Sequence, residues 1–258
     1  MPFEELQNVS PAILGAIYFV GGLIILVAAV SVIVSIWLTL QYIVYNRRKN
    51  ARNLTGNDAA RHILDQNGLQ HIKVSVVGSL MFGNSYSHYF KKVRLRRLTV
   101  RKPSIASLAM GAEKAALAVL DKENDPDMKK RVALTPLIYF GPLAFVPLLV
   151  VGVIVDFIFF GFSGVVSLIA LVAAFLFYVL SFVLSIMVLK TEIKAQDRAC
   201  RILQYENMAT AEEIVMIKKL FKLYNIQYVN DIVLELLQLI LRILQFVAKA
   251  QSNSENNA

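Results

Sequence analysis

Residues that form metal centres and disulfides are scarce in this sequence. Its 258 residues include one cysteine, Cys200, and three histidines, His62, His71 and His88. A single cysteine excludes an internal disulfide and a cysteine-rich metal cluster. No two of the histidines are four residues apart, which is the spacing of the ligand pair in a zinc-binding helix. We therefore interpret Cys200 as a small residue packed on a helix.

The motifs of several protein classes are missing as well. The sequence has no phosphate-binding loop, no dinucleotide fingerprint and no G-x-S-x-G nucleophile elbow. No nucleic-acid-binding module accompanies its positive charge, so we expect no nucleic acid partner. It also lacks the internal repeats and paired interrupted helices that are typical of transporters. Residues 1–11 contain two glutamates and no basic residue, unlike a secretory signal, and we expect them outside the membrane.

Apolar residues, by contrast, are abundant. They make up 57% of the chain, and the mean hydropathy is +0.57. Since about 20 apolar residues cross a bilayer, the long apolar runs predict transmembrane helices at residues 12–45, 137–161 and 164–189. We expect two prolines, Pro142 and Pro147, to kink the second of these helices.

A fourth apolar helix, at residues 228–250, carries one polar stripe. The stripe consists of Asp231, Glu235, Gln238, Arg242, Gln245 and Lys249. Such a helix either spans the bilayer with its stripe against its neighbours, which we favour, or lies in the interface. We expect it to be separate from a polar helix at residues 211–224, and residues 251–258 to be a disordered tail.

Positive charge is concentrated in one loop. The net charge is +9, and residues 46–136 hold 18 Lys or Arg against 7 Asp or Glu, a surplus of 11. Because basic loops stay on the cytoplasmic side of a membrane, we place this loop inside the cell, and the helices of residues 190–227 with it. A basic loop beside a membrane also attracts anionic lipids. Membrane lipids are therefore expected partners.

Residues 46–136 have the patterns of a small α+β domain. A helix is predicted at residues 53–68, with Thr55 as its N-cap and Asp58 three residues later, close to a capping box. Alternating apolar and polar residues predict strands. These strands are at residues 71–77 and 91–102, and a polar loop is expected at residues 121–131.

The helix predicted at residues 104–123 connects this domain to the second membrane helix. At 3.6 residues per turn it is amphipathic, and Glu113 and Leu117 lie one turn apart on the flank of its apolar stripe. Lys114 falls on the opposite side. The apolar stripe comprises Ile105, Leu108, Ala109, Ala112, Ala116 and Leu120.

Three segments together resemble the bacterial integral-membrane neutral zinc metallopeptidases, the YugP-like family. Residues 54–69 read LTGNDAARHILDQNGL and are close to that family's TG-x-x-x-A-R-x-I-L-x-x-N-G-L signature. Residues 104–120 fall where the family has small residues leading into H-E-A-G-H-A. Residues 192–203, EIKAQDRACRIL, resemble its E-x-N-A-S-x-R-A segment.

This resemblance implies a mostly α-helical, multi-pass protein of the bacterial plasma membrane. The family fold implies three to four transmembrane helices, with a small cytoplasmic zincin-like α+β domain between the first two. The order and spacing of the three segments agree with the family over about residues 10–248. The family's D-H-Y-D-P stretch appears as NSYSHYF at residues 84–90, so it is altered.

The resemblance also implies which positions would hold zinc. The two ligand histidines fall on Glu113 and Leu117, the general-base glutamate on Lys114 and the third ligand on Glu192, the one retained residue of the four. A catalytic zinc needs about three protein ligands and an open position for water. Leu117 has no lone pair to donate, and Lys114 repels a cation and offers no base at neutral pH. We therefore expect a catalytically inactive homologue that needs no cofactor, although the family implies zinc.

Two other functions stay open beside this one. An active peptidase with an atypical oxygen-rich site would use Glu113, Glu192 and His88. A lipid-facing or transport component would depend on the basic loop and the polar stripe. We favour a membrane scaffold that binds a protein partner or a second copy of itself.

Without a metal, the two glutamates need other partners. We expect Glu113 to pair with Lys114 or a nearby arginine. We expect Glu192 to lie on a helix surface opposite Lys190 or Lys194.

Overall fold

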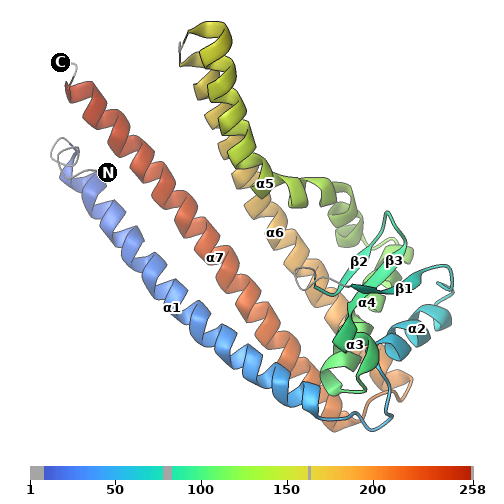
Figure 1. The fold of residues 1–258 in the computed structure, drawn as a ribbon. Helices are drawn as coiled ribbons and strands as arrows, with labels where there is room; N and C mark the ends of the chain where they lie inside the picture. The colour runs from blue at the N-terminus through green and yellow to red at the C-terminus, as the bar shows by residue number, and fades with distance from the viewer. Residues whose placement is uncertain (1–8, 78–82, 162–163, 257–258) are drawn as a thin grey trace. The chain divides into compact units, whose positions relative to one another are not determined.

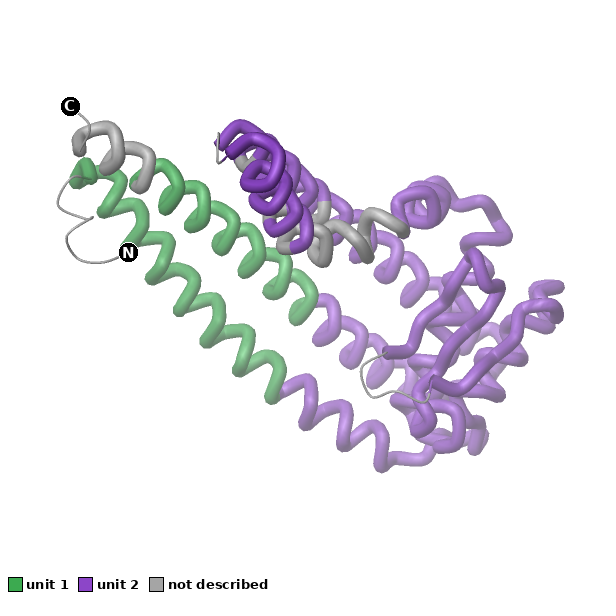
Figure 2. Tube along the Cα trace, turned by 45° about the horizontal axis from the view of Figure 1, so that its top comes forward, with its two compact units in different colours: residues 1–36, 226–258 green, residues 37–225 purple. Residues whose placement is uncertain are grey.

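The protein is mostly helical and divides into two compact units. The computed structural model describes residues 9–77, 83–161 and 164–256. One unit comprises residues 1–36 and 226–258, and the other comprises residues 37–225 (Figure 2). The elements in chain order are α1 (Pro11–Arg47), α2 (Gly56–Gln66), β1 (Lys73–Val77), β2 (Ser85–Ser87), β3 (Lys92–Arg96), α3 (Arg97–Arg101), α4 (Ile105–Lys122), α5 (Pro126–Phe160), α6 (Val165–Tyr205) and α7 (Ala211–Asn256) (Figure 1).

The smaller unit joins part of α1 to part of α7 through polar side chains. Asp231 Oδ1 accepts hydrogen bonds from Gln227 Nε2 at 2.9 Å and from Ser31 Oγ at 3.4 Å. Gln227 Nε2 also lies 3.0 Å from Ser31 Oγ, as donor to the hydroxyl. The first residue of the polar stripe therefore faces a neighbouring helix.

The last helix differs from the sequence-based expectation. α7 runs without a break from Ala211 to Asn256, so the two separate helices expected at residues 211–224 and 228–250 are one. Residues 251–256, expected to be a disordered tail, belong to the same helix. Residues 224–228 contain neither glycine nor proline, so nothing in the sequence terminates the helix there.

Among the described residues, two helices are long and apolar enough to span a membrane. They are Pro11–Arg47 and Leu168–Tyr205, and Val150–Phe160 is a shorter apolar stretch at the end of α5. The side chain of Pro142, where we expected a kink, lies outside the described residues. α5 ends at Gly161, whose φ of 57° is the left-handed conformation that commonly closes a helix.

The first helix that lies wholly within the larger unit, α2, is capped as predicted. Thr55 Oγ1 accepts the Asp58 N–H at 3.2 Å, and Asp58 Oδ2 accepts the Thr55 N–H at 2.9 Å. This reciprocal pair is a capping box. At the other end, Asn67 is the C-cap and Gly68 has a φ of +66°. The prediction for residues 53–68 is confirmed.

The predicted small sheet is present, with three strands in the order β1-β3-β2. β1 pairs with β3 in parallel and β2 pairs with β3 antiparallel. Val93 and Leu95 are fully buried while Arg94 between them lies on the other face, as strand alternation requires. The strand expected at residues 91–102 is wrong in its second half. It ends at Arg96, because the adjacent Arg96 and Arg97 cannot both face solvent in a strand, and the chain turns into α3.

α4 is the core of the larger unit. Every residue from Ile105 to Leu120 is buried, so the helix is not amphipathic as we expected. It is enclosed because α2, α3, α5, α6 and strands β2 and β3 all contact it (Figure 1). The loop expected at residues 121–131 is shorter, because Asp125 caps a new helix that starts at Pro126 by accepting the N–H groups of Asp127 and Met128.

α2 and α4 approach closely enough to require glycine on both helices. A Cβ at Gly111 would overlap the Gly56 carbonyl oxygen and lie 2.8 Å from the carbonyl carbon. A Cβ at Gly56 would lie 2.5 Å from the Thr99 carbonyl oxygen and 2.6 Å from that of Ser107. These obstacles are backbone atoms, which cannot rotate away.

We predict that Gly111→Ala destabilises the protein by about 1–3 kcal/mol, the usual cost of overpacking a core. Thermal unfolding followed by circular dichroism in maltoside micelles measures this effect. Gly22→Ala in α1 is the matched control, because no atom lies within 4 Å of its added Cβ. A midpoint for Gly111→Ala equal to that of the wild type would contradict the close approach.

Candidate functional site

Lys114 lies between a buried carboxylate, Glu113, and a partly buried one, Glu192. α4 supplies Lys114 and its neighbour Glu113, and α6 supplies Glu192. The Lys114 Nζ is 2.8 Å from Glu192 Oε2 and 3.0 Å from Glu113 Oε2. Glu113 is 4% exposed and Lys114 9%. The three positions that the family resemblance marks as ligand, base and third ligand are therefore together.

A second cation completes the charge balance. Arg131 on α5 places Nη2 2.6 Å from Glu192 Oε1, so each carboxylate oxygen of Glu192 contacts one positive charge. The expectation that Glu192 lies on a helix surface opposite Lys190 or Lys194 is wrong. Those two lysines pair instead with Asp127 and Asp125 in the first turn of α5.

Hydrogen bonds from two side-chain amides extend the cluster to α7. Gln196 Nε2 donates to Glu113 Oε1 at 2.9 Å, and Asn225 Nδ2 donates to Gln196 Oε1 at 2.8 Å. The expectation that Glu113 pairs with Lys114 is confirmed. The whole chain of contacts, from Arg131 to Asn225, joins four helices in the interior of the larger unit.

Burial and the neighbouring charges shift the titration of these groups. Burial raises the pKa of Glu113, although the Lys114 charge opposes the rise. For Lys114, burial acts to lower the pKa, but Glu113 and Glu192 outweigh it and the pKa is raised. Burial opposes ionisation of Glu192 as well, yet Lys114 and Arg131 lower its pKa to about 2. Lys114 and Glu192 are therefore both charged at neutral pH.

Leu117 belongs to the hydrophobic core rather than to the polar cluster. Its side chain is 1% exposed and packs in the same core as the other apolar residues of α4. Cys200 on α6 is also buried in this core, and burial raises the pKa of its thiol to about 11, so it is an unreactive packing residue.

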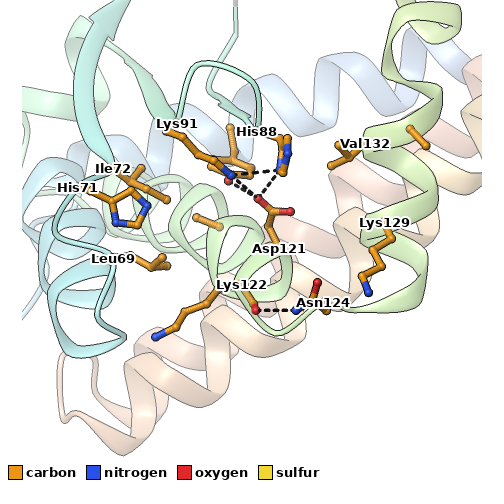
Figure 3. A pocket seen from close by; sticks show the side chains of 13 residues that line it. Leu69, His71, Ile72, His88, Lys91, Asp121, Lys122, Asn124, Lys129 and Val132 are labelled. Carbon is orange, nitrogen blue, oxygen red and sulfur yellow. Dashed lines mark hydrogen bonds and ion pairs between the residues drawn. The ribbon is translucent and has the colours of Figure 1, made fainter.

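His88 lies in a separate cleft with Asp121. Its Nδ1 is 2.6 Å from Asp121 Oδ2, near the C-terminal end of α4 (Figure 3). The metal-ligand set of Glu113, Glu192 and His88, which we considered from the sequence, is therefore not assembled. Within the described ranges, no three His, Cys, Asp or Glu side chains are grouped so that they could hold a metal ion. Of the other histidines, His71 lines the same cleft and His62 lies 3.5 Å from Glu206.

Sequence reasoning missed four residues of these two sites. Gln196 follows Glu192 by one helical turn, so helical spacing alone would have placed it on the same face. Asp121 stands two turns after Glu113 and Lys114 on α4. The sequence around Arg131 and Asn225 does not indicate that these residues belong to the cluster, because only the packing of α5 and α7 against α6 brings them there.

A comparison with protein families agrees with the sequence resemblance. A family model described as "Putative neutral zinc metallopeptidase" matches residues 20–247. The matched range includes every residue of the buried cluster and of the cleft. No curated protein and no solved structure gives a significant match to the chain.

We predict that Glu192→Gln destabilises the protein at neutral pH by about 3 kcal/mol, because it leaves two buried cations with one carboxylate fewer. The pKa of Glu192 is about 2 in the fold against an ordinary 4.5. A lowered pKa stabilises the fold above pH 4.5, and this contribution is lost as the pH falls toward 2. The stability difference between wild type and Glu192→Gln, measured by urea unfolding, should therefore shrink over that range. Glu212→Gln at an exposed position is the control, and a difference independent of pH would disprove the ionised pair.

Proposed function

The chain belongs to the neutral zinc metallopeptidase family, and we propose that it is a member without peptidase activity that serves as a membrane scaffold. The observation that carries this proposal is the position of the Lys114 ammonium between Glu113 and Glu192. In the family, the corresponding positions supply zinc ligands and the general base. Here a protein side chain places positive charge between the two carboxylates.

The side chains at these positions do not fit a catalytic zinc. Such a zinc needs about three nitrogen, oxygen or sulfur ligands from the protein. Leu117 provides an isobutyl group, and Lys114 is a cation that would repel the metal. Lys114 and Arg131 together carry two positive charges, the same charge as one zinc ion, and they contact the carboxylates directly. The proposed role of this pair is to replace the metal in holding the helices together.

Lys114 also cannot act as the base that a peptidase requires. A general base must be able to accept a proton near the operating pH. Both glutamates raise the pKa of the Lys114 ammonium above its ordinary value, so the side chain stays protonated. Activation of a water molecule at this position therefore has no proton acceptor.

Membrane attachment and surface charge support the scaffold role. We propose a multi-pass protein of the bacterial plasma membrane with the N-terminus outside and residues 46–136 in the cytoplasm. α1 and α6 are apolar enough to span the bilayer. Lys92 and Arg96 on β3 are exposed, which favours contact with anionic lipids. The protein partner is either another polypeptide or a second copy of this chain.

We predict that the purified protein contains no stoichiometric zinc and hydrolyses no casein. Inductively coupled plasma mass spectrometry and a fluorescent casein assay measure the two quantities. Zinc at one ion per chain, together with hydrolysis that a chelator abolishes, would refute the proposal. Proteolysis that is lost in His88→Ala would instead support the active alternative with an atypical site.

Restoring the family residues gives the converse test. The triple variant Glu113→His, Lys114→Glu, Leu117→His should acquire zinc, because Glu192 already contacts the side chain at position 114. Adding Glu192→Ala to the triple variant removes the third ligand and should lower zinc affinity by about tenfold or more. A folded triple variant that binds no zinc would show that this part of α4 is not the former metal site.

A further inference from the structure

A cleft of about 440 Å³ opens in the larger unit, separate from the buried cluster. Its sides are the segment between α2 and β1, the turn between β2 and β3, the end of α4 and the start of α5 (Figure 3). Apolar side chains of Leu69, Ile72 and Val132 line part of the wall. Clefts that combine an apolar wall with a few convergent polar groups are typical ligand sites.

Asp121 is the one carboxylate among the described residues that line the cleft, and it already has hydrogen-bond and charge partners. Asp121 Oδ2 accepts a hydrogen bond from the Tyr86 hydroxyl at 2.6 Å and lies 2.6 Å from His88 Nδ1 and 3.5 Å from Lys91 Nζ. Burial acts to raise the pKa of Asp121, but the hydrogen bonds from Tyr86 and His88 outweigh it and the pKa is lowered. Asp121 is therefore ionised and holds its neighbours in place.

The contact with Asp121 determines which nitrogen of His88 faces a ligand. An ionised carboxylate only accepts hydrogen bonds, so Nδ1 carries the proton that it donates to Asp121. In the neutral ring, Nε2 is then left as a hydrogen-bond acceptor. No hydrogen bond to Nε2 is formed within the described part of the chain.

Two lysines of the cleft can contact an anion, although Lys91 also lies 3.5 Å from Asp121 Oδ2. Lys91 lies on the β2–β3 turn, and its backbone N–H donates to the His88 carbonyl. Lys129 lies on α5, on another side of the cleft (Figure 3). Both are exposed. A third lining lysine, Lys122, already donates to the Asn67 carbonyl. The described residues that line the cleft include three lysines and one carboxylate.

We propose that this cleft binds a phosphate monoester whose organic part is apolar. Lys91 and Lys129 would contact the phosphate oxygens by charge-assisted hydrogen bonds. The monoanion of a phosphate monoester keeps one O–H, whose pKa is near 6, and this hydroxyl donates a hydrogen bond to His88 Nε2. A sulfate ester and a carboxylate offer no such proton. The apolar wall accommodates the organic part.

The test uses the full-length chain in maltoside micelles and n-hexyl phosphate as the probe. Isothermal titration calorimetry should show saturable binding, with n-hexyl sulfate binding at least about tenfold more weakly because it lacks the O–H donor. The double variant Lys91→Met, Lys129→Met should weaken binding about tenfold or more. The matched control Lys92→Met, Lys130→Met removes the same charge from adjacent residues that do not line the cleft, and should bind within about twofold of the wild type.

A variant of His88 distinguishes recognition of the phosphate O–H from attraction of any anion by positive charge. His88→Gln should reduce the preference for hexyl phosphate over hexyl sulfate while leaving sulfate binding nearly unchanged. The proposal is overturned by the absence of saturable binding, by equal affinities for the two esters, or by equal losses in the two lysine pairs. Unchanged far-UV circular dichroism and thermal midpoints establish that the variants are folded.

Two sources of this ligand chemistry are distinguished by a lipid competitor. Phosphatidic acid carries a phosphate monoester head group, whereas phosphatidylglycerol is a diester of similar apolar content. If phosphatidic acid in the micelles displaces hexyl phosphate and phosphatidylglycerol does not, the ligand is a lipid head group. If hexyl phosphate binds and neither lipid competes, the ligand is a soluble phosphate monoester. Equal displacement of hexyl phosphate by both lipids would show that the site binds anionic lipids by charge alone, and this result would overturn the proposal.

Discussion

The buried ammonium of Lys114 is the interaction on which the larger unit depends. Removing a charged amine from water is costly unless opposite charges surround it. Glu113 and Glu192 meet that requirement at 3.0 and 2.8 Å, and Arg131 compensates the second charge of the carboxylate pair. Because these residues come from α4, α5 and α6, the electrostatic requirement of one side chain constrains the packing of three helices. The polar chain through Gln196 extends the same constraint to α7.

α4 connects the charge cluster to the other elements of the larger unit. Its buried surface is continuous, so each side of the helix must be covered by a different element. Glycine at positions 56 and 111 allows α2 to approach on one side, and Glu113 and Lys114 meet α6 on another. The end of the same helix presents Asp121 to the cleft. One helix therefore positions both the charge cluster and the proposed phosphate site about two turns away.

The two sites have opposite chemical character. The cluster of Glu113, Lys114 and Glu192 pairs its own charges, and Glu113 and Lys114 are buried, so it favours structural stability over ligand binding. The cleft keeps Lys91, Lys129 and one ring nitrogen of His88 accessible. The same helix, α4, therefore contributes to a charge-paired cluster at one position and to an open, lysine-lined cleft at another.

The sequence by itself determined the features that depend on neighbours along the chain. Thr55 and Asp58 are three residues apart and cap α2, and the alternation around Val93 and Leu95 specifies a strand. The resemblance to the family singles out Glu113, Lys114 and Glu192 from the sequence. Only the tertiary structure decided which residues surround them. Arg131, Gln196 and Asn225 are distant in sequence from Lys114, and the burial of all sides of α4 follows from how many elements pack on it. Sequence periodicity describes one helix at a time, whereas the burial and pairing of a charged side chain depend on every element that excludes water from it.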